Sequence, residues 1–373
     1  MLFILSTKGR FNLSNLSHVS TRLLSTTNDP RKWLVERFQC EEERLDRQLG
    51  IIFTYGKCVN VSEMEDRADW LQQRLKLKNP DLKKIVQTWP LIFSYESHDN
   101  LEPKLQYLQS RLKLSDLQLT SLIRRYPHIF TMNPDKLERK LLYLQQRLKL
   151  DDDSQIRKFI MESTSILNSS VQKNLEPKII WIQKRLDLND DEVSKIILKF
   201  PRILQISLKK KLEPMMDWLQ QERLRLTDGQ LRTFIRKSPQ VLSYSIEQKI
   251  QPTLKWFQKN LDLKDDAEIN TFVNKLPTLL DYSIKNNLEP TLEFYIESIG
   301  NKGDAITLLT KSPRAFGASL ENRLKPRLDE AKEAGMVIDQ RCLLRIATYT
   351  EKMWRANLEH RSKETFKVKI EET

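Results

Sequence analysis

The chain has 373 residues, of which 39% are hydrophobic and 30% charged, and its 63 Lys and Arg residues against 50 Asp and Glu residues give a net charge of +13. The apolar content is too high for a disordered chain, and the excess positive charge favours a polyanionic partner. Only eight glycines are present, which argues against the glycine-rich phosphate loop of a dinucleotide-binding domain. The three cysteines are scattered, so we expect neither a disulfide framework nor a zinc site. No apolar run approaches the ~20 residues that cross a bilayer, so we expect no membrane insertion.

The first 27 residues have the composition of an organelle transit peptide. They contain Lys8, Arg10 and Arg22 and many Ser and Thr residues, and the first acidic residue of the chain is Asp29. A basic, hydroxyl-rich and acid-free start is typical of such peptides. The Arg-Leu-Leu-Ser stretch that begins at Arg22 resembles the cleavage context of mitochondrial presequences. We therefore predict mitochondrial import with residues 1–27 as the transit peptide; plastid import and a disordered basic tail are the alternatives.

A unit of 36 to 38 residues recurs from residue 64 to residue 349, and the preceding residues 28–63 are either a helical lead-in or a degenerate repeat. Its first, mostly proline, column is Asp66, Pro103, Arg139, Pro177, Pro214, Pro252, Pro290 and Pro326. Four residues further on stands an aromatic column: Trp70, Tyr107, Tyr143, Trp181, Trp218, Trp256 and Phe294. An Arg-Leu-x-Leu motif then begins at Arg74, Arg111, Arg147, Arg185 and Arg223. The second proline column is Pro90, Pro127, Thr164, Pro201, Pro239, Pro277 and Pro313.

The spacing inside the unit predicts two helices. Apolar residues in the first half recur at i, i+4, i+7 and i+11, which places them on one face of a helix whose first turn holds the proline. In the second half, residues such as Asp116 can cap a helix that the second proline ends, because proline disfavours α geometry in the residue before it. A unit of this size cannot bury its own apolar face. We therefore predict an all-α, right-handed-type α-solenoid of about seven repeats, each with two helices and a short turn-like or 3-10 element.

Two further expectations follow from the columns. The aromatic column is expected to pack in the core between repeats, because repeating aromatic residues are normally packing residues. The third repeat has lost both prolines and carries Arg139 and Thr164 instead. A local irregularity is therefore expected at residues 139–170.

The two-proline unit resembles a known family. The pattern L-x-P-x-L-x-[WYF]-L-x-x-R-L-x-L, followed by [IF]-[IV]-x-x-x-P-x-[IVL]-[LF], is similar to the repeat of the mTERF family of organelle transcription-termination-like factors over residues 64–349. The resemblance implies a curved superhelix with a basic concave face that binds double-stranded DNA or, in many relatives, organellar RNA. It also implies a role in transcription, RNA processing or ribosome assembly. One departure is that the usual glycine of the L-G-L turn is Lys, Asp or Arg here.

A basic column lies two residues before the second proline. It reads Thr88, Arg125, Glu162, Lys199, Lys237, Lys275 and Lys311. Because this position recurs once per repeat, stacking would line the charges up along a phosphate backbone. The predicted nucleic-acid-binding residues are the basic members and their neighbours: Arg125, Lys199, Lys237, Lys275, Lys311, Arg124, Arg202, Arg236 and Arg314. The alternative is a solvated face whose cations complement the helix dipole. The Arg of Arg-Leu-x-Leu is not included, since helix capping or pairing with a nearby Asp explains it equally well.

No catalytic or metal site is predicted. The four histidines have no partner at ligand spacing, and Asp151-Asp152-Asp153 falls where other repeats place a helix cap. Gly300-Asn301-Lys302-Gly303 lacks the strand of a phosphate loop. We therefore predict a monomeric, non-catalytic protein without cofactor or metal. As the resemblance implies, we expect it to bind double-stranded DNA and to regulate organelle transcription, including its termination. The alternatives are an organelle RNA-binding factor in transcript processing or ribosome assembly and a protein-binding α-solenoid scaffold. Residues 350–373 are expected to form a charged tail that could bind a protein partner.

Overall fold

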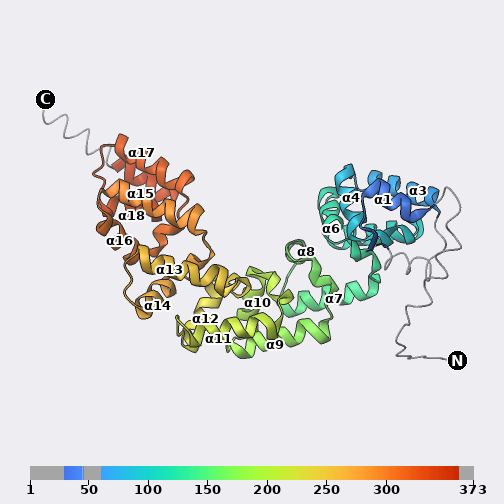
Figure 1. Ribbon diagram of the computed structural model, residues 1–373, viewed down its shortest axis with the longest axis horizontal. Helices are drawn as coiled ribbons and strands as arrows, with labels where there is room; N and C mark the ends of the chain where they lie inside the picture. The colour runs from blue at the N-terminus through green and yellow to red at the C-terminus, as the bar shows by residue number, and fades with distance from the viewer. Residues whose placement is uncertain (1–28, 44, 46–59, 361–373) are drawn as a thin grey trace. The chain divides into compact units, whose positions relative to one another are not determined.

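The computed structural model describes residues 29–43, 45 and 60–360 of the chain. Every element in these ranges is a helix, which confirms the predicted all-α repeat fold. Contacts group the chain into two compact units that divide between Val171 and Gln172, and within each unit the helix pairs follow one another in a stack (Figure 1). None of the helices in the described ranges is both long and apolar enough to span a bilayer. The predicted transit peptide, residues 1–27, lies outside the described residues.

Each repeat contains a first and a second helix, and we number the repeats 1 to 8 in chain order. The first helices are α3 (Val61–Arg74), α5 (Glu102–Arg111), α7 (Pro134–Leu148), α9 (Glu176–Arg185), α11 (Glu213–Gln221), α13 (Gln251–Asn260), α15 (Glu289–Ile299) and α17 (Lys325–Glu333). The second helices are α4 (Asn79–Thr88), α6 (Asp116–Arg125), α8 (Asp153–Glu162), α10 (Asp190–Lys199), α12 (Asp228–Lys237), α14 (Asp266–Lys275), α16 (Lys302–Lys311) and α18 (Gln340–Thr348).

Repeats 1 to 7 end in a five-residue 3-10 helix, as predicted. These helices are η3 (Pro90–Ser94), η5 (Pro127–Thr131), η6 (Thr164–Asn168), η8 (Pro201–Gln205), η10 (Pro239–Ser243), η12 (Pro277–Asp281) and η14 (Pro313–Gly317). The second proline stops the preceding α-helix by holding the residue before it out of α geometry; Tyr126, for example, has φ −144° and ψ 70°. The 3-10 helix then buries its apolar pair against the repeat, as Ile129 and Phe130 show.

A single π-helical turn precedes six of the first helices. These turns are η4 (Ser97–Leu101), η7 (Val171–Leu175), η9 (Leu208–Leu212), η11 (Ile246–Ile250), η13 (Ile284–Leu288) and η15 (Leu320–Leu324). Each is followed at once by the α-helix with the column proline at its first or second position, as at Pro290. The predicted proline in the first turn of the α-helix is confirmed, but helical structure extends one turn further upstream than the sequence pattern indicated.

Repeats 1 and 3 begin without a π turn in the part of the chain that the structure describes. In these repeats the spacing between the N-cap residue and the first proline column is one residue shorter than in the others. Asn60 and Asn133 cap regular α-helices six residues before Asp66 and Arg139, the members of the first proline column. Elsewhere the cap lies seven residues before the column, as Ser207, Ser245, Ser283 and Ser319 do. The widened turn therefore takes up one additional residue. This regular α7 is the irregularity expected in repeat 3, whereas its 3-10 helix forms at Thr164 without proline.

Helix α1 (Pro30–Phe38) has the features of the end of a first helix. Trp33 and Arg37 have the spacing of the aromatic and Arg columns, and Gln39 takes a left-handed conformation like the turn residue of Arg-Leu-x-Leu. Arg37 pairs with Glu65 of the following repeat at 3.2 Å. These features of α1 fit a degenerate leading repeat, one of the two interpretations of residues 28–63.

The turn between first and second helices is left-handed in repeats 1 to 6 although it lacks glycine there; only Gly300 and Gly335 of repeats 7 and 8 supply glycine among the described turns. Six residues adopt φ between 42° and 52°: Lys76, Lys113, Lys149, Asp187, Arg225 and Asp262. A side chain costs free energy in this conformation because Cβ approaches the backbone. The turn is therefore imposed by the packing of the two helices that it joins.

The aromatic column lies at the margin of the core rather than wholly inside it. Trp256 and Phe294 are each 8% exposed, but Trp181 and Trp218 are half-buried. The expectation of a core column is therefore right for the last two members and too strong for the others.

Near the C-terminus, residues 351–360 are helical and Trp354 is fully buried, so the predicted tail from residue 350 begins with a packed helix.

Candidate nucleic-acid interface

Each repeat has two chemically different ends because its two helices run in opposite directions. At one end, Lys178 at the start of α9 donates to the carbonyl oxygen of Leu204 in the 3-10 helix at 2.6 Å. At the other end, Gln183 near the end of α9 donates to Asp190 at the start of α10 at 3.0 Å. We call the first the 3-10 end, and the second, which carries the Arg-Leu-x-Leu motif, the Arg-Leu end.

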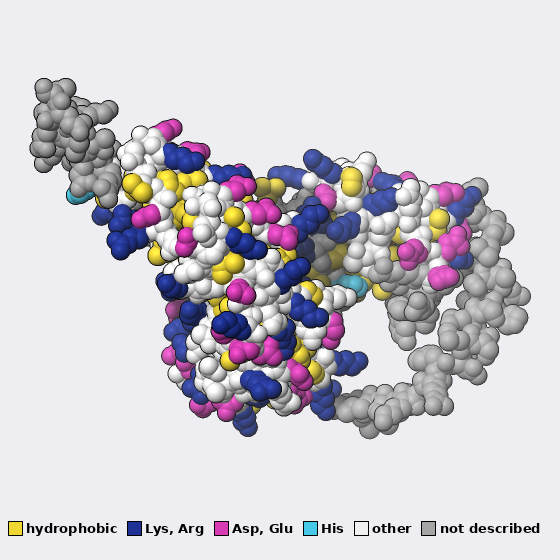
Figure 2. All heavy atoms as spheres, turned by 60° about the vertical axis from the view of Figure 1, so that its left-hand side comes forward, with side chains coloured by type: hydrophobic (Ala, Val, Ile, Leu, Met, Phe, Trp, Pro, Cys, Tyr) yellow, Lys and Arg dark blue, Asp and Glu magenta, His cyan; other side chains and the backbone are white. Residues whose placement is uncertain are grey.

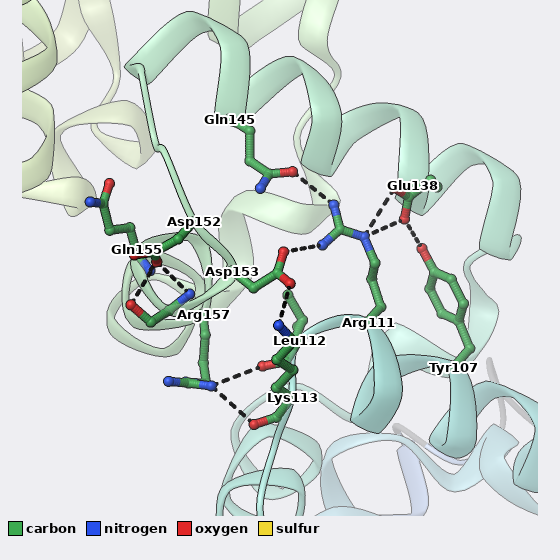
Figure 3. Close-up of polar contacts among 11 residues, drawn as sticks. Tyr107, Arg111, Leu112, Lys113, Glu138, Gln145, Asp152, Asp153, Gln155 and Arg157 are labelled. Atoms are coloured by element: carbon green, nitrogen blue, oxygen red, sulfur yellow. Dashed lines mark hydrogen bonds and ion pairs between the residues drawn. The ribbon is translucent and has the colours of Figure 1, made fainter.

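At the Arg-Leu end, cations are neutralised by acidic residues of the next repeat, as the surroundings of Arg111 show (Figure 3). Its guanidinium contacts Glu138 at 2.8 Å, Asp153 at 3.1 Å and the side-chain oxygen of Gln145 at 2.7 Å. Tyr107 donates to Glu138 at 2.5 Å. Burial raises the pKa of Glu138, but the hydrogen bonds from Tyr107 and Arg111 outweigh it, so that the pKa lies below its ordinary value. The Glu138 carboxylate is therefore held charged.

The same contact recurs along the chain. Its other members are Arg74 with Glu102 at 2.8 Å, Arg185 with Asp217 at 3.2 Å and Arg223 with Asp266 at 2.8 Å. These arginines therefore join neighbouring repeats and have little charge to offer a ligand. Leaving the Arg of Arg-Leu-x-Leu out of the predicted binding residues is consistent with these contacts.

All nine predicted binding residues are exposed and lie at or beside the 3-10 end. Two of them pair with an acidic residue of the preceding repeat. Arg124 contacts Asp81 at 2.9 Å, and Arg236 contacts Glu192 at 3.0 Å. A surface ion pair of this kind is worth at most about 1 kcal/mol, so both arginines can exchange their partner for a phosphate.

Three others donate to main-chain carbonyl groups where the second helix of the next repeat ends. Arg125 donates to Met161 at 2.7 Å, Lys199 to Lys237 at 2.5 Å and Lys275 to Thr310 at 3.1 Å. A carbonyl at a helix C-terminus carries only a partial negative charge. These cations therefore link repeats and keep most of their charge. The contact of Lys199 also brings the cations of two successive repeats, Lys199 and Lys237, next to each other.

The side chains of the remaining four predicted residues have no hydrogen-bond or ion-pair partner in the described part of the chain; these residues are Lys237, Lys311, Arg202 and Arg314. All lie in the second unit, where η8, η10, η12 and η14 contact one another in order. The 3-10 end of this unit is thus a row of elements that carries cations without carboxylate partners. Figure 2, by contrast, shows Lys and Arg interspersed with Asp and Glu over much of the face in view.

A buried cation column was missed by the sequence analysis. Residues one position after the first proline column donate to the main chain beside the 3-10 end; they are Arg67, Lys104, Lys140, Lys178 and Arg327. Burial lowers the pKa of Lys178, which is only 7% exposed. The signal was visible as a basic residue after proline, but its spacing fits a solvated face equally well. Arg67, Lys104, Lys140 and Lys178 position the 3-10 helix of their own repeat, because their buried or half-buried side chains are bonded to its carbonyl groups.

The helix pairs and the cationic 3-10 end define a helical-repeat protein suited to a polyanion. The mTERF family model matches residues 69–184 and 178–349, so the chain belongs to the mTERF family. This family is known for nucleic-acid-binding proteins of organelles. No curated protein matches the chain.

Proposed function

We propose that this protein binds double-stranded DNA in mitochondria without catalysis and regulates transcription there, including its termination. The observation that carries the proposal is the difference between the two ends of the repeats. Arginines at the Arg-Leu end are neutralised by the next repeat, as at Arg185, whereas cations at the 3-10 end such as Lys237 and Lys311 have no carboxylate partner among the residues that the structure describes. Phosphate groups supply that missing negative charge and release counterions when they do so.

The four unpartnered cations make the sharpest test, because their removal breaks no contact inside the described part of the protein. We expect the variant with Arg202, Lys237, Lys311 and Arg314 changed to Gln to bind duplex DNA with a salt slope lower by about 3.6, or about 0.9 for each lost phosphate contact. Its melting temperature should remain that of the parent. Binding is measured by fluorescence anisotropy at several salt concentrations.

The matched control removes the same charge from positions outside the 3-10 end in the same unit. Lys184, Lys255, Lys259 and Lys264 are exposed and have no side-chain partner in the described residues. Changing these four to Gln should leave the salt slope nearly unchanged. Equal losses in the two variants would show that binding follows net charge alone and would refute the proposed interface.

The bound nucleic acid distinguishes the proposal from its alternatives. Crosslinking in mitochondria followed by sequencing should recover DNA at defined positions. Recovery of ribosomal or precursor RNA instead would support the second candidate, an organelle RNA-binding factor in transcript processing or ribosome assembly, for which the same cations serve equally well. Absence of any enriched nucleic acid would leave the protein-binding scaffold, which the mixed charges in Figure 2 would then favour.

A further inference from the structure

Several exposed cations of the second unit lie on elements that adjoin one 3-10 helix, η10 (Pro239–Ser243). This helix contacts η8 of the preceding repeat and the π turn η9 (Leu208–Leu212) of its own repeat. Lys237 lies directly before η10, and Lys199 donates to the carbonyl oxygen of Lys237 at 2.5 Å. Arg202 belongs to η8. Helices α10 and α12 and the 3-10 helix η8 therefore each bring a cation to the surroundings of η10. The π turn η9 is the fourth element that does so.

The π turn η9 contributes charge that the basic column did not include. Its sequence is Leu-Lys-Lys-Lys-Leu, with Lys209 and Lys210 exposed and Leu212 buried. Neither exposed lysine has a side-chain partner in the described residues, whereas Lys211 is half-buried. The pKa of Glu247 is lowered by hydrogen bonds to its main chain and to Ser245, and the charge of the nearby Lys211 lowers it further. The other five π turns read SHDNL, VQKNL, IEQKI, IKNNL and LENRL, and none of them has more than one Lys or Arg.

These lysines are not needed for the fold of the turn. The apolar residues at its ends and the cap at Ser207, which accepts from the Lys210 main-chain N–H at 3.3 Å, hold η9 in place. The other π turns form with His, Gln, Glu, Asp, Asn or a single Lys at the same two positions, and none of them has lysine at both. Adjacent like charges without carboxylates repel one another, and a bound polyanion relieves this repulsion. The lysines therefore require an explanation outside the fold.

The cluster also has a boundary on the side of the next repeat. Asp281, the last residue of η12, accepts hydrogen bonds from Ser238 at 3.0 Å, Gln240 at 2.6 Å and Tyr244 at 3.1 Å. Burial raises the pKa of Asp281, although these hydrogen bonds and the nearby Lys249 oppose the rise. A carboxylate at this position repels phosphate, so Asp281 separates the cations around η10 from Lys311 and Arg314 further along the row.

We propose that Lys209 and Lys210, together with Arg202 and Lys237, form the principal phosphate-binding cluster of the protein, at which two neighbouring phosphodiester groups of a nucleic acid bind. We call these four residues the η10 cluster. The inference rests on the proposed nucleic-acid binding and adds where along the repeats the backbone is held most tightly. The η10 cluster, rather than a uniform row, supplies most of the electrostatic affinity.

The test changes only the two lysines that the basic column omits. In the full chain, Lys209→Gln with Lys210→Gln removes two phosphate contacts, each worth a factor of about 8 in duplex affinity at about 0.1 M salt. We expect binding of a duplex of random sequence to fall about 60-fold and the salt slope to fall by about 1.8. The control, Lys255→Gln with Lys259→Gln, removes two equally exposed lysines from α13 and should change affinity less than about 2-fold.

The outcomes separate this inference from the proposed function. If the variant at Arg202, Lys237, Lys311 and Arg314 weakens binding and the double-lysine variant does not, the η10 cluster is wrong and the proposed function stands. If the parent protein binds neither duplex DNA nor RNA, both are wrong.

Vesicles of equal parts phosphatidylcholine and phosphatidylserine serve as a second probe. Loss of vesicle binding with unchanged duplex binding would assign the lysines to a membrane surface and overturn the inference.

Discussion

At the scale of single residues, this chain places ordinary side chains in a backbone conformation that glycine adopts at least cost. The turn residues of Arg-Leu-x-Leu have positive φ, and Arg225 has the smallest value, 42°. Its side chain is exposed and has no partner in the described residues. The conformational cost at Arg225 is therefore not offset by a contact, unlike that of Lys76, which pairs with Asp116 of the next repeat.

The first prediction follows from this difference. Arg225→Gly should raise the free energy of unfolding by about 1 kcal/mol, because glycine removes the strain of the left-handed conformation. Glycine also gives the unfolded chain more conformational freedom, which cancels part of this stabilisation. Chemical denaturation of the two proteins measures the change. Arg225→Ala is the matched control and should leave stability near the parent value, since Ala keeps Cβ. A glycine variant that is less stable than the alanine variant would contradict the strain argument.

At the scale of elements, the first helices come in two forms. The forms differ by one residue in the spacing between the N-cap residue and the first proline column. The π turn accompanies the longer spacing in repeats such as repeat 7, where Leu288 N–H donates to Ser283 five residues back at 3.0 Å. The proline column and the longer spacing occur together in these repeats, so either could cause the turn. We attribute it to the additional residue, because both Ser283 and the buried Leu288 are fixed by their contacts.

The second prediction separates these causes in repeat 7. Deletion of Asn286 combined with Pro290→Arg should produce a regular α-helix from the cap onward, as in repeat 3. Pro290→Arg alone should keep the π turn, since the additional residue still has to be accommodated between two fixed points. A structure of each variant shows the hydrogen-bond pattern directly. Conversion to a regular helix by the single substitution would assign the turn to proline instead.

The elements also show how far sequence reasoning reached. The proline columns predicted the helix pair and the 3-10 helix because proline acts locally on the residue before it, as at Tyr126. The π turn was missed because it depends on one residue of spacing rather than on a residue type. The exposure of Lys237 followed from its place on the helix. The contacts of Lys199 and Arg236 did not, because they depend on how the next repeat is placed, which a pattern within one repeat does not contain.

At the scale of the whole molecule, the two ends of the repeats divide the charge between structure and ligand. The Arg-Leu-x-Leu arginines are used in contacts between repeats, so they offer little charge to a ligand. In the second unit, the 3-10 end has exposed cations without carboxylate partners in the described residues. The candidate phosphate-binding residues there come from the predicted basic column and from Lys209 and Lys210, which the sequence analysis missed. The proposed nucleic-acid binding requires a compartment with accessible nucleic acid. The proposed mitochondrial location depends on the residues before α1.

The last prediction concerns that segment. Asp29 caps α1 and accepts from the main-chain N–H of Arg31 at 2.9 Å, so a functional mature chain has to retain it. The acid-free residues before Asp29 are expected to be removed on import, with cleavage after about 24 residues, near the Arg-Leu-Leu-Ser stretch at Arg22. Mass spectrometry of the protein from purified mitochondria identifies the first residue. Arg22→Gln should slow processing and lengthen the mature chain, whereas Lys8→Gln removes the same charge away from the cleavage stretch and should not. An organelle-resident protein that still begins at Met1 would contradict the transit peptide, and its absence from mitochondria would contradict the location.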